Sequence, residues 1–68
     1  MLMSLKWVDV REIAILLAER HTDINPLAVS FPRLRDLVIA LPEFDDDPAR
    51  SGEKVLEAIQ GLWIEELD

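Results

Sequence analysis

Apolar residues recur at helical spacing in three separate segments, and this pattern constrains the fold of the chain more than any other feature. Their positions are Val10, Ile13, Ala14 and Leu17 in the first segment, Leu34, Leu37, Val38 and Leu41 in the second, and Leu56, Ile59 and Trp63 in the third. Residues three or four apart share one face of an α-helix. We therefore predict three helices around one core.

Local signals predict where these helices begin. Asp9, followed three residues later by Glu12, has the pattern of a capping box, in which two side chains bind the free N–H groups of a first turn. Pro32 suits the first turn of the second helix, where its missing N–H costs nothing. Ser51 can cap the third helix, and Glu53 then lies at the positive end of the helix dipole.

Other signals predict where the helices end. The first helix is expected to end near Arg20 or His21, because residues 22–26 carry turn chemistry. Pro42 stops the second helix. Residues 27–31 are too few for a helix and include a β-branched valine, so we predict a short strand or extended link there.

The length of the chain predicts one domain over residues 1–68. A chain of 68 residues buries only about 60% of its unfolded surface, and with no cysteine it must be held together by packing. Half of the residues are hydrophobic, which is enough for a core. The predicted fold is mainly α: a small three-helix, winged-helix-like domain with at most a short vestigial β element.

The charge of the chain limits its partners. Fourteen acidic residues against seven basic ones give a net charge of −7. Nucleic acids and anionic membranes are therefore excluded as partners, and cations or basic protein surfaces are favoured. No apolar run approaches the roughly 20 residues that cross a bilayer, and the first residues lack the pattern of a signal peptide. We expect a cytoplasmic protein.

The densest charge is the run Glu43-Phe44-Asp45-Asp46-Asp47-Pro48. Carboxylates this close repel one another, so either an external cation or basic surface compensates them, or the run is simply a solvated loop. Oxygen ligands suit Ca²⁺, Mg²⁺, Mn²⁺ or Fe²⁺, but the spacing is not that of an EF-hand. Any metal site here is expected to be open, weak and poorly selective.

Further acidic residues lie in and after the third helix. Glu53 and Glu57, one turn apart, form either another carboxylate pair or a solvated face beside Lys54. Glu65 and Glu66 approach a helix C-terminus, where the dipole disfavours negative charge, so they serve binding or belong to a frayed tail. Phe44 is either an apolar anchor for a partner or a core residue. We favour the core, because phenylalanine is usually buried.

Catalytic patterns are absent from the sequence. It has no cysteine nucleophile, no glycine-rich phosphate loop and no histidine pair at metal spacing. His21 is its only imidazole, and none of the serines has a base beside it in the sequence. We expect a protein that is not an enzyme.

Several short motifs together resemble one known family. They are Leu5-Lys6-Trp7, Asp9, Arg11-Glu12-Ile13, Phe44-Asp45-Asp46-Asp47-Pro48, Glu53-Lys54, Leu56-Glu57-Ala58-Ile59, Trp63 and Glu65. The combination is similar to the IscX (YfhJ) iron–sulfur assembly proteins from Leu5 to about Glu66. The resemblance implies weak Fe²⁺ binding by surface carboxylates, and binding to the cysteine desulfurase IscS on a surface that overlaps those of frataxin and ferredoxin.

The resemblance carries these roles onto particular residues. The candidate metal ligands are Glu43, Asp45, Asp46, Asp47, Asp9 and Glu12. The candidate partner-binding residues are Asp45, Asp46, Asp47, Glu53, Glu57, Glu65 and Glu66. The leading hypothesis is an adaptor that modulates sulfur delivery by the desulfurase, and the alternative is an iron buffer or iron donor. Ile15 and Pro42 depart from the family pattern. Ile15 is apolar at a position of the first helix where the family pattern implies a polar or acidic side chain. A metal site at Asp9 and Glu12 is therefore less secure than one in the acidic loop.

Overall fold

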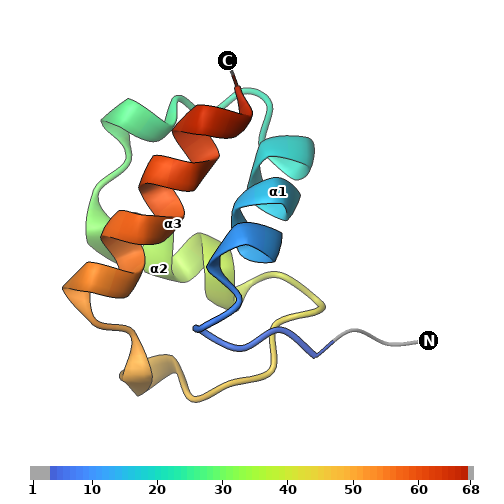
Figure 1. Ribbon diagram of the computed structural model, residues 1–68, viewed down its shortest axis with the longest axis vertical. Coiled ribbons are helices and arrows are strands. Elements are labelled where there is room, and N and C mark those ends of the chain that lie inside the picture. Colours follow the sequence, from blue (N-terminus) through green and yellow to red (C-terminus); the bar gives the residue numbers. More distant parts are fainter. Residues whose placement is uncertain (1–3, 68) are drawn as a thin grey trace.

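The computed structural model describes residues 4–67, which form a three-helix domain with two additional 3₁₀ turns (Figure 1). The elements in chain order are α1 (Val10–Arg20), η1 (Pro26–Ala28), α2 (Phe31–Ile39), η2 (Pro48–Arg50) and α3 (Glu53–Glu66). The only β pairing in this range is an isolated parallel bridge between Leu5 and Phe44. The prediction of a mainly α domain with a vestigial β element is confirmed.

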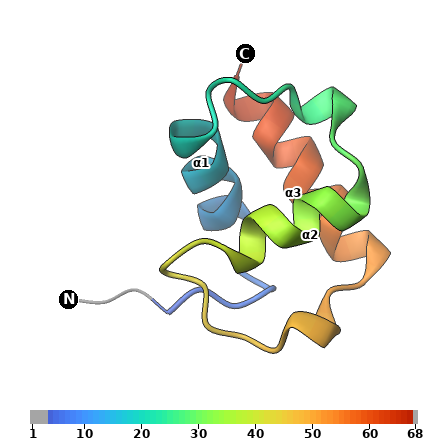
Figure 2. The ribbon, with the colours of Figure 1, turned by 180° about the vertical axis from the view of Figure 1, so that it is seen from behind.

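The core lies where the apolar faces of the helices meet. α1 and α3 lie side by side, and α2 crosses at one end of the pair (Figures 1 and 2). The side chains with no exposed surface are Ile13, Ala14 and Leu17 from α1, Leu34 and Val38 from α2, and Ile59 and Trp63 from α3. Each of them belongs to the helical spacing found in the sequence. No helix within residues 4–67 has the length and apolar character needed to cross a membrane.

Two of the predicted helix caps are wrong. Asp9 does occupy the N-cap position of α1, but its carboxylate accepts a hydrogen bond from the Lys6 N–H at 2.8 Å and caps no helical N–H group. A hydrogen bond of 2.9 Å from the Asp9 N–H to the Lys6 carbonyl closes the turn before the helix. This turn brings the Lys6 N–H within reach of the Asp9 carboxylate, which binds it in place of a helical N–H group. Gly52, not Ser51, is the N-cap residue of α3, because the Ser51 hydroxyl turns back towards the Pro48 carbonyl.

Of the two alternatives predicted for residues 27–31, the strand is wrong, and the extended link is confirmed only for Val29 and Ser30. The chain forms the turn η1, capped by the Asn25 side chain, and only Val29 and Ser30 are extended before α2. Gln60 of α3 donates hydrogen bonds to the carbonyls of Pro26, at 2.7 Å, and Val29, at 3.3 Å. In a β-sheet these carbonyls would accept hydrogen bonds from a neighbouring strand. Here they accept them from Gln60, so the segment between α1 and α2 is bound to helix α3.

Candidate functional site: the acidic loop and the segment that binds it

The acidic loop, residues 43–48, lies against the N-terminal segment, residues 4–9 (Figures 1 and 2). The Leu5 N–H donates to the Glu43 carbonyl and the Asp45 N–H donates to the Leu5 carbonyl, each at 2.8 Å. This pair of bonds forms the isolated parallel bridge. The loop is therefore held by main-chain bonds to a segment about forty positions away in the sequence.

An aromatic contact fixes the same two segments from the inside. The rings of Trp7 and Phe44 meet edge to face with their centroids 4.7 Å apart, a favoured geometry for aromatic pairs. Trp7 is only 3% exposed, and its indole N–H donates to the Asp47 carbonyl at 2.8 Å. The expectation that Phe44 turns inward is confirmed, so Phe44 is not an exposed anchor for a partner.

Asp46 uses both carboxylate oxygens within the fold. Oδ2 accepts the Trp7 N–H at 3.0 Å, and Oδ1 accepts the Asp47 N–H at 2.7 Å. These two backbone hydrogen bonds lower the pKa of the Asp46 carboxyl below its ordinary value. The bond from Trp7 has the larger effect. Asp47 likewise binds a backbone group, because its Oδ1 accepts the Ala49 N–H at 2.9 Å and caps η2.

Glu43 is paired with Arg20 from the end of α1. The two side chains form a two-pronged ion pair, in which Arg20 Nη1 lies 2.6 Å from Glu43 Oε1 and Nη2 binds Oε2. Hydrogen bonding to Arg20 lowers the pKa of the Glu43 carboxyl and raises that of the guanidinium. Glu43 therefore fastens the loop to α1.

Asp45 is a loop carboxylate that points outward. Its side chain is 74% exposed. The Ser4 hydroxyl donates to Oδ2 at 3.1 Å, and the Lys6 ammonium binds the Asp45 carbonyl and lies 3.5 Å from Oδ2. Asp45 Oδ1 accepts no hydrogen bond from another residue in the 4–67 range.

The candidate metal ligands are not gathered into one cluster. Across residues 4–67, no group of three or more histidine, aspartate or glutamate side chains is placed to hold a metal ion. Asp9, Glu43 and Asp46 are bound by groups of the protein, as described above, and Glu12 is exposed on α1. Iron binding stays a prediction. In the loop, Asp45 and Asp47 each keep one carboxylate oxygen that accepts no hydrogen bond from another residue between 4 and 67.

The predicted partner-binding residues of α3 form a second group of acids. Glu53, Glu57, Glu65 and Glu66 are all exposed. None of them makes an ion pair or a side-chain hydrogen bond with another residue between 4 and 67. The helix continues to Glu66, so Glu65 and Glu66 belong to an ordered last turn. These carboxylates are available to an external partner.

Comparison with known proteins identifies the chain. The family model for iron-sulphur cluster assembly matches residues 5–68. This protein belongs to the IscX (YfhJ) family of iron–sulfur cluster assembly. An uncharacterized protein of Pseudomonas aeruginosa is 64% identical to it over 66 residues, which cover 97% of this chain and 100% of that protein. The resemblance read from the short motifs is confirmed, as is a role in iron–sulfur cluster assembly.

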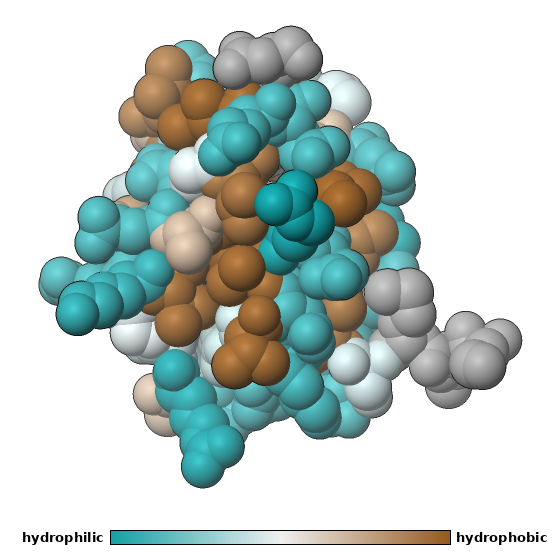
Figure 3. All heavy atoms as spheres, viewed as in Figure 1, coloured by the Kyte–Doolittle hydropathy of each residue, from teal (hydrophilic) through white to brown (hydrophobic). Residues whose placement is uncertain are grey.

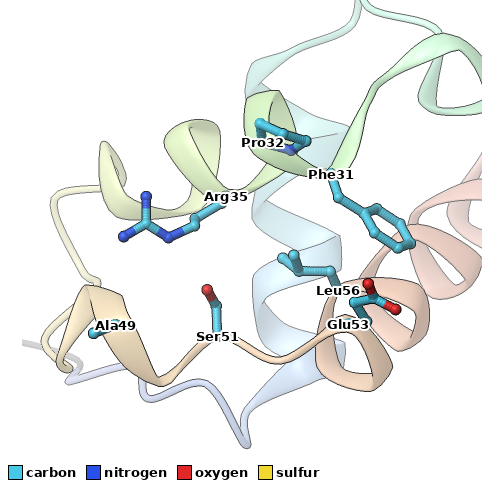
Figure 4. Close-up of a pocket in the computed structure, with 7 residues that line it drawn as sticks. All are labelled: Phe31, Pro32, Arg35, Ala49, Ser51, Glu53 and Leu56. Carbon is cyan, nitrogen blue, oxygen red and sulfur yellow. The ribbon is translucent and has the colours of Figure 1, made fainter.

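This family member also has an open cleft that sequence patterns did not indicate. The cleft, of about 490 Å³, lies between the start of α2 and the chain that enters α3 (Figure 4). It is lined by Phe31, Pro32, Arg35, Ala49, Ser51, Glu53 and Leu56. Arg35 Nε donates to the Pro48 carbonyl at 3.2 Å, which ties this cleft to the end of the acidic loop. Its lining comes from three segments that only the fold brings together.

Proposed function

We propose that this protein docks through its acidic surface on a basic surface of the cysteine desulfurase IscS and modulates sulfur delivery, without catalysing a reaction itself. The observation that carries the proposal is the attachment of the acidic loop to the N-terminal segment and to α1 by several independent contacts. Main-chain bonds, the Trp7–Phe44 contact and the Arg20–Glu43 pair hold the loop in one shape. A charged loop that is already ordered loses little conformational freedom on binding.

Charge supports the same proposal. The net charge of −7 on so small a domain attracts a basic surface over a distance and raises the rate of encounter. On the face viewed in Figure 3, apolar surface is interrupted by hydrophilic side chains. On this face, an electrostatic contact therefore suits the protein better than a broad apolar one. Membership of the family supports the choice of partner, and we propose that frataxin and ferredoxin compete for the same desulfurase surface.

A titration of the isotope-labelled protein with IscS tests this proposal. We expect amide shifts at the acidic loop and along α3 at low salt, and smaller shifts at moderate salt, because salt screens exposed charges. Replacing Asp45 and Asp47 by asparagine, or Glu57 and Glu65 by glutamine, should weaken the complex. The double variant Glu19→Gln, Asp23→Asn, which removes two exposed acids at the end of α1 and in the turn after it, is the charge-matched control. Absence of shifts at both salt concentrations would refute docking on this enzyme.

A second function is an iron buffer or iron donor, with Fe²⁺ bound weakly by surface carboxylates. The free oxygens of Asp45 and Asp47 on one short loop favour it. Glu43 and Asp46 would have to leave their internal partners before they could bind metal. Anaerobic titration with Fe²⁺ in excess Mg²⁺ tests this function. Complete loss of Fe²⁺ binding in Mg²⁺ would argue against it, because hard oxygen sites without selectivity take either ion.

A further inference from the structure

Lys6 places a positive charge beside an exposed carboxylate of the acidic loop, that of Asp45. Its ammonium group binds the Asp45 carbonyl and lies 3.5 Å from the Asp45 carboxylate. The side chains of Lys6 and Asp45 are 47% and 74% exposed, so the contact lies at the surface, where a partner can reach it.

The backbone on both sides of Lys6 is fixed. Leu5 and Trp7 are each 3% exposed, Leu5 is hydrogen-bonded to the loop in both directions, and the Trp7 N–H is bound by Asp46. The ammonium group therefore starts from an anchored main chain beside Asp45. This arrangement lowers the entropy cost that usually weakens a surface ion pair.

Lys54 offers a direct comparison, because it and Lys6 are the only lysines in the chain. Lys54 is exposed in the first turn of α3 and makes no ion pair with another residue in the described range. Both residues carry the same charge, but only Lys6 is bound to a carboxylate that a basic partner would use.

We propose that Lys6 is an intramolecular competitor for the acidic loop, so that a basic side chain of the partner must displace it from Asp45 when the proteins dock. The inference rests on the proposed function and concerns the regulation of the same surface. Docking then exchanges an internal ion pair for an intermolecular one. Lys6 lowers the affinity of the loop for a cation that competes with it at Asp45.

Two variants with equal charge test the inference. Lys6→Gln and Lys54→Gln each change the net charge by the same amount, so a general electrostatic gain is common to both. We expect Lys6→Gln to bind IscS about two- to fivefold more tightly than Lys54→Gln at low salt, the range that corresponds to a surface ion pair. In an Asp45→Asn background the difference between the two variants should disappear.

A second probe separates this inference from the proposed function. Tetralysine amide, titrated against each variant while the Asp45 amide signal is followed, reports on the loop without the desulfurase. If wild-type protein fails to bind IscS, the proposed function fails, and the tetralysine series still decides the role of Lys6. Equal binding of the probe by the two variants, or weaker binding by Lys6→Gln, would overturn the inference. The indole N–H signal of Trp7, compared between the variants and the wild-type protein, checks that the N-terminal segment keeps its position against the loop.

Discussion

The acidic loop and helix α3 carry the same kind of residue but use it differently. In the loop, Glu43 and Asp46 are bound within the fold, by Arg20 and by backbone N–H groups. On α3, Glu53 and Glu57 bind no other described residue. The comparison teaches that a cluster of acids in a sequence is not by itself a cluster of free ligands.

The reason lies in the backbone. A helix satisfies most of its own N–H groups, so side chains on its exposed face are not needed as acceptors. An irregular loop leaves N–H groups without main-chain partners, and aspartate is a short acceptor that can reach them. Asp46 and Asp47 bind three such groups in the loop and its neighbours.

The largest expected effect concerns the contact that joins the loop to the core. Trp7→Ala removes a buried ring that packs on Phe44, and loss of a buried tryptophan costs about 3–5 kcal/mol of the free energy of unfolding. Urea denaturation followed by circular dichroism measures this loss. Leu27→Ala, at a residue that is 74% exposed, should change little. If the two variants were equally stable, the loop would not be part of the cooperative core.

A smaller effect separates the two groups of acids. Asp46→Asn puts an amide where two N–H groups need acceptors, so we expect a lower urea midpoint. Glu57→Gln changes an exposed side chain on α3 and should leave the midpoint unchanged or slightly raised, since it relieves repulsion in an acidic protein. The reverse order of the two midpoints would contradict the division between internal and free carboxylates.

The dependence of stability on pH tests the same division. The pKa values of Glu43 and Asp46 are lower in the folded protein than their ordinary values. Their contribution to stability is therefore complete above the ordinary carboxyl pKa of about 4 and is lost as the pH falls through the folded-state values. Urea midpoints between about pH 6 and pH 2.5 measure this loss. We expect a shallower fall in the double variant Glu43→Gln, Asp46→Asn than in the wild-type protein. Parallel falls in the two proteins would show that these pKa shifts do not contribute.

The smallest change is expected on the exposed side of α3. Gly61 lies within the helix, and an added Cβ there would meet no atom within 4 Å. Gly61→Ala should therefore raise the free energy of unfolding by about 0.5–1 kcal/mol, because alanine loses less backbone freedom than glycine when a helix forms. Thermal unfolding followed by circular dichroism checks this. A destabilised variant would mean that this face of α3 packs more tightly than the structure shows.

The buried faces of the helices could be predicted from the sequence, but the side chains that cap their ends could not. The spacing of Ile13, Leu17 and Leu34 gave the correct buried faces, because helical geometry alone decides which residues share a side. The caps failed, because Asp9 and Ser51 had other bonding partners within reach. Only the folded chain fixes which of several acceptors a given N–H meets.

The three helices and the acidic character could be predicted from helical spacing and from composition, and the family from the combination of short motifs along nearly the whole chain. Which carboxylates are free depends on the tertiary structure. Asp45 and Asp46 are neighbours with the same side chain, yet Asp46 binds the backbone of Trp7, whereas Asp45 faces solvent beside Lys6. That difference depends on a contact between segments about forty residues apart, and a contact of this range leaves no periodic or local pattern in the sequence.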